Sequence, residues 1–362
     1  MRIVVAPDSF KGTLTAAEAA IAIATGLQQA LPDAEILRVP LADGGEGTAS
    51  VWQAAVGGTW ETLATVDPLG RPRNAAVLWL DATTVVIEAA TAIGLPLLAD
   101  RERNPWRVSS YGLGELIAQV LPRAQTLWIT LGGSATVDGG IGCFQALGAA
   151  IVDAQGLAVE PGGAGLATVA AVHWPKIEAD IHLALDVTNP LLGELGAAQV
   201  FAPQKGADPA MVEALEVAMQ RWANVAGGEP QAAGMGAAGG LGYGLHCLGA
   251  HCHRGIEVIL AATRLREQLS GADWVITGEG CSDRQSSGGK VVGGVLELAQ
   301  SLKVPALVLS GAVKHTEVQP LLDRGAVAVW DATPHGGVNL PQDAATCLCW
   351  ASEQLGRMLA QR

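Results

Sequence analysis

The chain has 362 residues, of which 49% are hydrophobic and 4% aromatic, and its formal net charge is -13 at neutral pH. This composition excludes a disordered chain, and the length favours two domains over one or three. The negative charge argues against nucleic-acid or anionic-membrane binding, because both require a basic face.

The first residues, "MRIVVAPDS", meet a proline and an aspartate after four apolar residues, too soon for a signal sequence. No run of about 18 uncharged apolar residues occurs, so no membrane-spanning helix is predicted. We therefore expect a cytoplasmic protein whose six cysteines stay reduced. The densest cysteine and histidine cluster, "HCLGAHCHRG" at 246–255, is a weak zinc signal, and an ordinary structural role is favoured over a metal site.

The N-terminal segment predicts a strand, a loop and a helix: "RIVVA", "PDSFKGTL" and "TAAEAAIAIATGLQQAL". Thr15 with Glu18 three residues later forms a capping box, and the apolar residues that follow have helical spacing. A second strand, "AEILRVPLA", comes next. A strand, helix and strand in succession predict a parallel pair joined by a right-handed crossover.

The middle of the chain is less regular, with strands expected in "TLWITLGG" and "HLALDVTNPL". The stretch "AGGEPQAAGMGAAGGLGYGL", residues 226–245, lacks the serines and charges of flexible linkers. We expect it to pack tightly or to form a ligand loop, and a linker is the alternative.

The C-terminal third alternates the strands "DWVIT", "ALVLS" and "AVAVW" with helices expected near 289–302, 316–324 and 343–361. Such alternation predicts an α/β fold with a doubly wound, mostly parallel sheet. Ligands of such sheets bind where the strands end, so the loops after the strands are the candidate site.

Five loops have one composition, in which a strand ends and glycine, an acid and a hydroxyl or lysine follow. They are "APDSFKGT", "LADGGEGT", "LGGSATVDGG", "LDVTNPLLG" and "TGEGCSDRQSSGGK". Glycines let backbone amides approach phosphate oxygens. None is a strict motif: a Walker A loop ending at Lys290 would need glycine at Arg284 and a hydroxyl at Val291, and no GxGxxG follows the first strand.

Phosphoryl transfer needs contacts to phosphate, carboxylates for magnesium, and a base near the attacking hydroxyl. The five loops contain all three kinds of group. Candidates for phosphate are Lys11, Lys290 and the amides of Gly132, Gly133 and Ser134; for magnesium Asp43, Glu46, Glu279 and Asp283; and for the base Asp186.

Each candidate also has a structural alternative. Asp8 and Asp186 could cap turns, and Ser134 and Thr136 could be N-caps of the next helix. Glu46 and Asp138 could be solvated loop acids, Lys205 a surface cation, and the segment 278–290 a surface turn.

The ordered blocks of this sequence resemble the bacterial glycerate kinases of type I. The blocks are "APDSFKGTLTA", "PLADGGEGT", "RNPWRVSSYGLGEL", "LGGSATVDGGIG", "LDVTNPLLG", "FAPQKGA", "GGLGYGL" and "ITGEG..D.QSSGGK", and they cover nearly the whole chain. The resemblance implies phosphorylation of D-glycerate to 2-phospho-D-glycerate with ATP and Mg²⁺, by an enzyme without nucleic-acid or membrane partners that is a monomer or homodimer.

The resemblance further implies two α/β domains with the active site in the cleft between them. One is a Rossmann-like domain formed by both chain ends, 1–75 plus 262–362, and the other is an inserted α/β domain, 76–261.

Carried onto this sequence residue by residue, the resemblance implies four groups of site residues. The catalytic group is Asp186, Lys11 and Asp8. The substrate-binding group is Ser9, Asp43, Gly44, Gly45, Glu46, Thr188, Asn189, Gln204 and Lys205. The nucleotide and phosphate group is Gly132, Gly133, Ser134, Thr136, Lys290 and Gln285, and the metal group is Glu279 and Asp283. We assign the carboxylate of glycerate to Lys11 and Ser9, the base to Asp186, and the phosphates to the Gly133 loop and Lys290.

Two positions depart from the expected pattern: Val137 replaces a frequent asparagine, and Cys281 replaces a frequent arginine that could bind phosphate through two hydrogen bonds. Arg284 is a candidate to compensate. Three other functions stay open. They are a kinase for the 3-hydroxyl or a related hydroxy acid, a non-catalytic glycerate or nucleotide sensor, and a metal protein built on the cysteine and histidine cluster.

Overall fold

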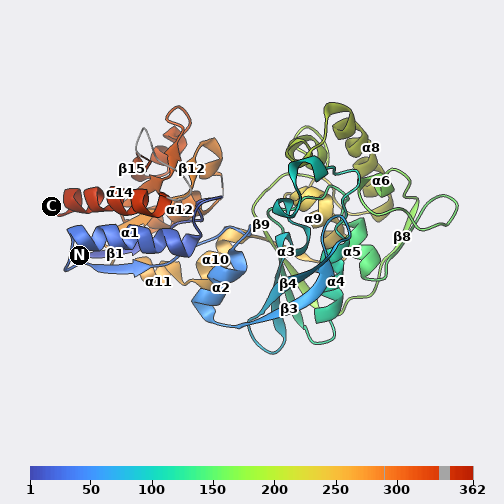
Figure 1. Cartoon of the computed structure of the whole chain (residues 1–362), viewed down its shortest axis with the longest axis horizontal. Helices are drawn as coiled ribbons and strands as arrows, with labels where there is room; N and C mark the ends of the chain where they lie inside the picture. The colour runs from blue at the N-terminus through green and yellow to red at the C-terminus, as the bar shows by residue number, and fades with distance from the viewer. Residues whose placement is uncertain (289, 334–342, 362) are drawn as a thin grey trace. The chain divides into compact units, whose positions relative to one another are not determined.

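A computed structural model describes residues 1–288, 290–333 and 343–361. The chain divides into two compact units (Figure 1). Unit 1 comprises Met1–Asp43, Ser50–Val56 and Ile256–Arg362, and unit 2 comprises Gly44–Ala49 and Gly57–Gly255. In the described residues, no helix is long and apolar enough to cross a membrane.

Unit 1 is built on a parallel sheet with the strand order β15-β13-β11-β1-β2. Its strands are β1 (Arg2–Val5), β2 (Glu35–Arg38), β11 (Trp274–Thr277), β13 (Ala306–Ser310) and β15 (Ala326–Asp331). Both chain ends therefore contribute to one sheet, and the predicted parallel pairing of the first two strands is confirmed. In this doubly wound sheet the chain adds β2 on one side of β1 and then β11, β13 and β15 on the other side, so the strand order reverses between β1 and β11. Ligands of such sheets bind at this reversal.

Helices cover both faces of this sheet. They are α1 (Ala16–Ala30), α2 (Thr48–Val56), α10 (Gly255–Ala262), α11 (Leu265–Leu269), α12 (Val291–Leu302), α13 (Gln319–Asp323) and α14 (Ala344–Leu359). On one face α1 and α14 run side by side and bury Ile23, Leu27 and Leu355 (Figure 1). Side chains of a strand alternate between faces, so the buried Val4, Val275 and Val308 point to the other face, where α12 contacts β11 and β13.

The predicted capping box at the start of α1 is confirmed. The backbone amide of Glu18 donates to Thr15 Oγ1 at 3.2 Å, and the amide of Thr15 donates to Glu18 Oε2 at 2.8 Å. These bonds satisfy donors that the first helical turn leaves free. The hydrogen bonds that the Glu18 carboxylate accepts from Thr15 lower the pKa of Glu18.

Unit 2 is built on a mixed sheet with the order β10-β9-β6-β5-β4-β3. The strands are β3 (Thr59–Val66), β4 (Pro72–Trp79), β5 (Thr84–Glu88), β6 (Thr126–Thr130), β9 (Asp180–Leu185) and β10 (His251–Arg254), and a separate pair is formed by β7 (Ala150–Val152) and β8 (Ala171–His173). The hairpin β3–β4 pairs antiparallel to β5. The domain boundaries predicted from the sequence placed residues 59–75 in the domain formed by the two chain ends. The pairing of β3 and β4 with β5 places these residues in unit 2.

The helices of unit 2 enclose a large apolar core. They are α3 (Ala90–Ile93), α4 (Tyr111–Val120), α5 (Ile141–Ala146), α6 (Gly163–Leu166), α7 (Ala197–Phe201), α8 (Pro209–Ala226) and α9 (Ala237–Cys247). The second half of the glycine-rich stretch packs tightly as expected, since residues 237–245 of α9 are buried, whereas residues 227–229 in its first half are exposed. Gly239 has φ +65° and a Cβ there would collide with the carbonyl of Thr136, so only glycine fits. The linker alternative is therefore wrong.

Candidate functional site

A pocket of about 390 Å³ lies at the carboxyl ends of the unit 1 strands. It is lined by Asp8, Ser9, Phe10, Lys11, Thr13, Asp43, Glu279, Gly280, Cys281, Asp283, Lys290, Gly311, Ala312, Ala332, Thr333, Ala344, Cys347 and Leu348. The loops after β1 and β11 supply Asp8 and Glu279, and these two strands flank the reversal of strand order. The segment 278–290 therefore lines a pocket, and its interpretation as a simple surface turn is wrong.

Three carboxyl groups approach one another in this pocket. Burial and the nearby Asp43 carboxylate raise the pKa of Asp8 to about 7, and Glu279 adds to the effect. Burial also raises the pKa of Glu279, although Ser282 Oγ donates to its Oε1 at 3.2 Å. Like charges held in a partly buried site disfavour ionisation, so the folded chain here concentrates negative charge that a cation would neutralise.

Positive charge borders the same pocket. Lys11 is exposed on the loop after β1, and Lys290 is the N-cap residue of α12. Lys314, in the segment after β14 (Ala312–Val313), donates to Asp283 Oδ2 at 3.2 Å, and Asp283 raises the pKa of Lys314. The predicted metal pair Glu279 and Asp283 thus differs in surroundings, because Asp283 already faces a lysine.

The donors in the pocket fit a magnesium ion that is shared with phosphate. Across the described ranges, no three His, Cys, Asp or Glu side chains gather closely enough to hold a metal by themselves. Mg²⁺ in phosphate-binding enzymes usually takes one or two carboxylates and completes its shell with water and substrate phosphates. The carboxyl groups of Asp8, Asp43 and Glu279 match that requirement, and burial with the nearby Asp43 and Glu279 raises the pKa of Asp8.

In unit 2, three predicted loops meet at the ends of β6 and β9. A Cβ on Gly132 would lie 2.5 Å from Gly45 Cα and 3.3 Å from Asp186 Oδ2, so only glycine permits this approach. The amide of Gly132 donates to the carbonyl of Gly44 at 3.3 Å. Asp186 follows β9 directly and is half-buried. Its carboxylate therefore lies beside the backbone of two glycine-rich loops.

Lys205 is buried in the same region, with a relative exposure of 4%. It ends η3 (Pro203–Lys205), and its Nζ donates to Ser134 Oγ at 3.0 Å and to the carbonyl of Thr136 at 2.8 Å. Burial lowers the pKa of Lys205 to about 7, while Asp138 and Asp186 act in the opposite direction. The alternative of a surface cation is wrong, and Lys205 holds the loop after β6 from within.

Asp138 is also an interior residue, not a solvated loop acid. Its Oδ2 accepts hydrogen bonds of 2.8 Å from both the amide and the hydroxyl of Ser110, and its Oδ1 accepts one of 3.1 Å from the amide of Gly140. Burial raises its pKa. The next helix, α5, begins after Gly140 without a side-chain cap, so Ser134 and Thr136 are not its N-caps.

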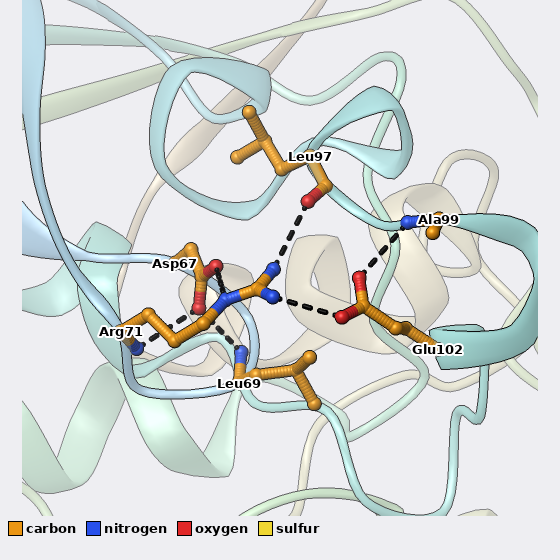
Figure 2. Close-up of polar contacts among 6 residues, drawn as sticks. All are labelled: Asp67, Leu69, Arg71, Leu97, Ala99 and Glu102. Atoms are coloured by element: carbon orange, nitrogen blue, oxygen red, sulfur yellow. Dashed lines mark hydrogen bonds and ion pairs between the residues drawn. The ribbon is translucent and has the colours of Figure 1, made fainter.

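A second network supports the loop after β6 from the other side. Ala135 donates to the carbonyl of Ile93 at 2.7 Å, and Leu95 donates to the carbonyl of Gly133 at 2.8 Å. Figure 2 shows how the segment following Leu95 is held: Arg71 donates to the carbonyl of Leu97 at 3.2 Å and to Glu102 at 2.9 Å.

Asp67 completes this network and orients the arginine. Its carboxylate accepts from the side chain and the backbone of Arg71 and from the amide of Leu69, and these bonds lower the pKa of Asp67 (Figure 2). The Gly133 loop is therefore fixed by backbone pairing on one side and by Lys205 on the other.

The remaining predicted residues have less specific positions. Glu46, Thr188 and Gln204 are exposed, and the side-chain amide of Asn189 donates to the carbonyl of Leu195 at 2.8 Å. Gln285 lies in η4 (Arg284–Ser287), and its side chain falls outside the described part of the chain. Of the two departures noted in the sequence, Val137 is fully buried in the unit 2 core, and Cys281 is exposed at the unit 1 pocket.

Sequence reasoning missed Glu88. It ends β5, and its carboxylate accepts from the amides of Ala49 at 2.6 Å and Gly47 at 3.4 Å, so it holds the "DGGEGT" loop. Burial raises its pKa. An acid at the end of an apolar strand was the available signal, but no glycine follows it at once as in the five selected loops.

Members of the cysteine and histidine cluster contact one another and neighbouring groups. His253 and His182 share a hydrogen bond of 2.9 Å, His182 stacks on Trp128, and the thiol of Cys247 donates to the carbonyl of Gly227 at 3.3 Å. No metal-binding group forms there within the described residues.

Comparison with known proteins gives a consistent result across the chain. A family model described as "Glycerate kinase family" matches residues 3–360. The chain is 41% identical to "Glycerate 2-kinase" of Escherichia coli (strain K12) over 86% of each chain. It is 39% identical to "Glycerate kinase" of Haemophilus influenzae over 91% of this chain and 90% of the relative.

A solved structure agrees with these sequence matches. It is described as a candidate glycerate kinase 2 from Salmonella typhimurium LT2 and aligns with a TM-score of 0.83 at 38% identity, over 100% of this chain and 98% of the other.

Proposed function

Because the chain belongs to the glycerate kinase family, we propose that it transfers the γ-phosphoryl group of ATP to D-glycerate and forms 2-phospho-D-glycerate. The observation that best supports this activity is the unit 1 pocket, where Asp8, Asp43 and Glu279 lie with Lys11 and Lys290 at the reversal of strand order. Carboxylates and ammonium groups in one pocket suit a ligand that carries both phosphate and a divalent cation.

Lys11 and Lys290 supply positive charge for anionic oxygens of the substrates. Phosphoryl transfer spreads negative charge over the transferred group, and preorganised cations lower the free energy of that state more than that of the ground state. Mg²⁺ held by one or two of the carboxylates Asp8, Asp43 and Glu279, together with phosphate oxygens, would neutralise phosphate charge when bound.

Asp186 is our candidate for the general base. A carboxylate beside the attacking hydroxyl can accept its proton as the oxygen attacks phosphorus. Asp186 is positioned for this role by the end of β9 and by the close approach of Gly132. We propose that groups of both units take part in the reaction.

Glycerate has two hydroxyl groups, and the assignment to the 2-hydroxyl follows the Escherichia coli relative, glycerate 2-kinase. We further propose a cytoplasmic location, which suits the free thiol state of all six cysteines.

Phosphorus NMR tests the proposal directly. Purified protein is incubated with ATP, magnesium and D-glycerate, and the spectrum is followed with time, with a reaction lacking glycerate as the control. A growing 2-phosphoglycerate signal with matched ADP release is the expected result. A 3-phosphoglycerate signal would keep the kinase and overturn the hydroxyl assignment, whereas glycerate binding without phosphoryl transfer would favour the sensor alternative.

A further inference from the structure

The lining of the unit 1 pocket changes in character along the carboxyl edge of the sheet. At the β15 and β13 end, the loops after these two strands contribute Ala332, Thr333, Gly311 and Ala312, none of which carries a charge. Asp283 also lines the pocket near Ala312, and its Oδ2 accepts a hydrogen bond of 3.2 Å from Lys314. The first turns of α14 add Ala344, Cys347 and Leu348 to the lining. This part of the pocket offers small apolar side chains and backbone polar groups, which suit a flat, weakly polar ring system.

At the β11, β1 and β2 end the lining is charged. Glu279 follows β11, Asp8 and Lys11 follow β1, and Asp43 follows β2. Neighbouring strands of a sheet are about 4.8 Å apart, so the four steps from β15 to β2 span roughly 19 Å. A three-carbon acid is much shorter than this edge of the sheet, whereas a nucleotide is longer and has an apolar base at one end and phosphates at the other.

We propose that the unit 1 pocket is the nucleotide site, with the base against the β15, β13 and α14 residues and the polyphosphate at Lys11, Lys290 and the acidic residues. D-Glycerate then binds at the unit 2 loops around Gly132 and Asp186. This inference rests on the proposed function. It differs from the sequence-based assignment, which placed the phosphates at the Gly133 loop and the carboxylate of glycerate at Lys11 and Ser9.

The hydrogen bonds of the unit 2 loop after β6 support this assignment of the two ligands to the two units. The hydroxyl of Ser134 already accepts from Lys205, and Lys205 is buried with its ammonium group donating inward. The loop after β6 therefore offers less free positive charge to a polyphosphate than the pocket of unit 1, where Lys11 is exposed.

The first test compares two neighbouring alanines of α14 by calorimetric titration with Mg·ADP. Ala344 is buried and lines the pocket, so Ala344→Leu fills the base end and should weaken ADP binding at least about tenfold, while Ala345 is exposed and lies outside this pocket. The control Ala345→Leu should bind ADP as the unmodified protein does. Equal ADP affinity in both variants would overturn the proposal.

A second test needs no substitution and therefore does not depend on how a variant folds. Cys281 is exposed at the pocket, and Cys252 is exposed in unit 2. Alkylation by iodoacetamide, read by mass spectrometry, should slow several-fold at Cys281 with Mg·ADP and stay unchanged at Cys252. Protection of Cys281 by D-glycerate but not by ADP would contradict the proposal.

These tests separate the inference from the proposed function. ADP protection of Cys281 without any phosphorylation of glycerate would support the nucleotide site and reject the kinase reaction. Normal formation of phosphoglycerate, with no protection of Cys281 by ADP and no effect of Ala344→Leu, would support the kinase reaction and reject the nucleotide site.

Discussion

The polar groups of the unit 1 pocket and those of the unit 2 loop after β6 come from similar sequence patterns but have different surroundings. In unit 1, Lys11 is exposed, and burial together with the nearby Asp43 and Glu279 raises the pKa of Asp8. In unit 2, Lys205 and Asp138 are buried and bonded to Ser134 and Ser110. The first set lines a pocket, and the second set is hydrogen-bonded within the protein and fixes a loop.

The difference shows that glycine, an acid and a lysine in one loop do not by themselves identify a phosphate site. Burying an ammonium group without good partners is costly, so a buried lysine is usually held by the protein's own acceptors. Lys11, in contrast, is exposed at the unit 1 pocket. Four substitutions test whether the two regions are divided in this way.

The largest effect should come from Asp186→Asn, which removes the proposed base but keeps the shape of the side chain. We expect kcat to fall by about 100- to 10,000-fold, because a positioned base contributes that much, while circular dichroism stays unchanged. The control Asp180→Asn changes the first residue of the same strand, where the side chain is exposed. Near-normal turnover in Asp186→Asn would remove this residue from the role.

A smaller effect is expected from Lys290→Met at the N-cap of α12. Loss of a charge-assisted hydrogen bond to phosphate should raise the KM for ATP by about ten- to hundredfold and leave the KM for glycerate nearly unchanged. Lys303→Met, at the C-cap of the same helix, is the matched control because Lys303 is exposed away from the pocket. If the KM for glycerate rose instead, the pocket would bind glycerate.

Lys205→Met should change how stability depends on pH. The pKa of Lys205 falls from 10.5 to about 7 on folding, so between these values the unfolded chain binds the proton more strongly. The contribution of this lysine to the free energy of unfolding therefore rises with pH, by about 1 kcal/mol per pH unit from pH 7.5 to 9.

Urea unfolding of both proteins at pH 7.5 and pH 9 measures this contribution. The unmodified protein should gain stability relative to Lys205→Met as the pH rises. A constant difference between the two proteins would mean that Lys205 keeps its proton throughout this range and would contradict the lowered pKa.

The smallest effect is expected from Arg71→Met, which breaks the network behind the Gly133 loop (Figure 2). Arg71 is exposed, and exposed ion pairs contribute little, so we expect the KM for glycerate to rise less than about fivefold with kcat nearly unchanged. Arg73→Met, two residues along the chain, is the control. A change in kcat alone would show that the network acts on the chemical step and not on substrate binding.

Local features of this fold could be predicted from the sequence. The apolar runs and the Thr15 and Glu18 capping box predicted β1, α1 and β2, and the alternation near the C-terminus predicted β11, α12, β13 and β15. These signals depend on residues within a few turns of one another. Asp8, Lys11, Asp43 and Glu279 were predicted as site residues because they follow those strands, and the structure places them around one pocket.

The sequence could not predict which polar side chains are buried or which groups they bond to, because both depend on residues far apart in the chain. Lys205 meets Ser134 across 71 positions, and Asp138 meets Ser110 across 28, so the sequence left both as possible surface groups. The order β15-β13-β11-β1-β2 likewise needs the two chain ends to pair.

The sequence by itself therefore determined the elements, the loops that carry chemical groups, and the resemblance to one family. The tertiary structure decided which of those groups face a pocket and which face one another. The physical reason is that desolvation and hydrogen bonding of a charged side chain depend on all the atoms around it, and those atoms come together only when distant segments pack.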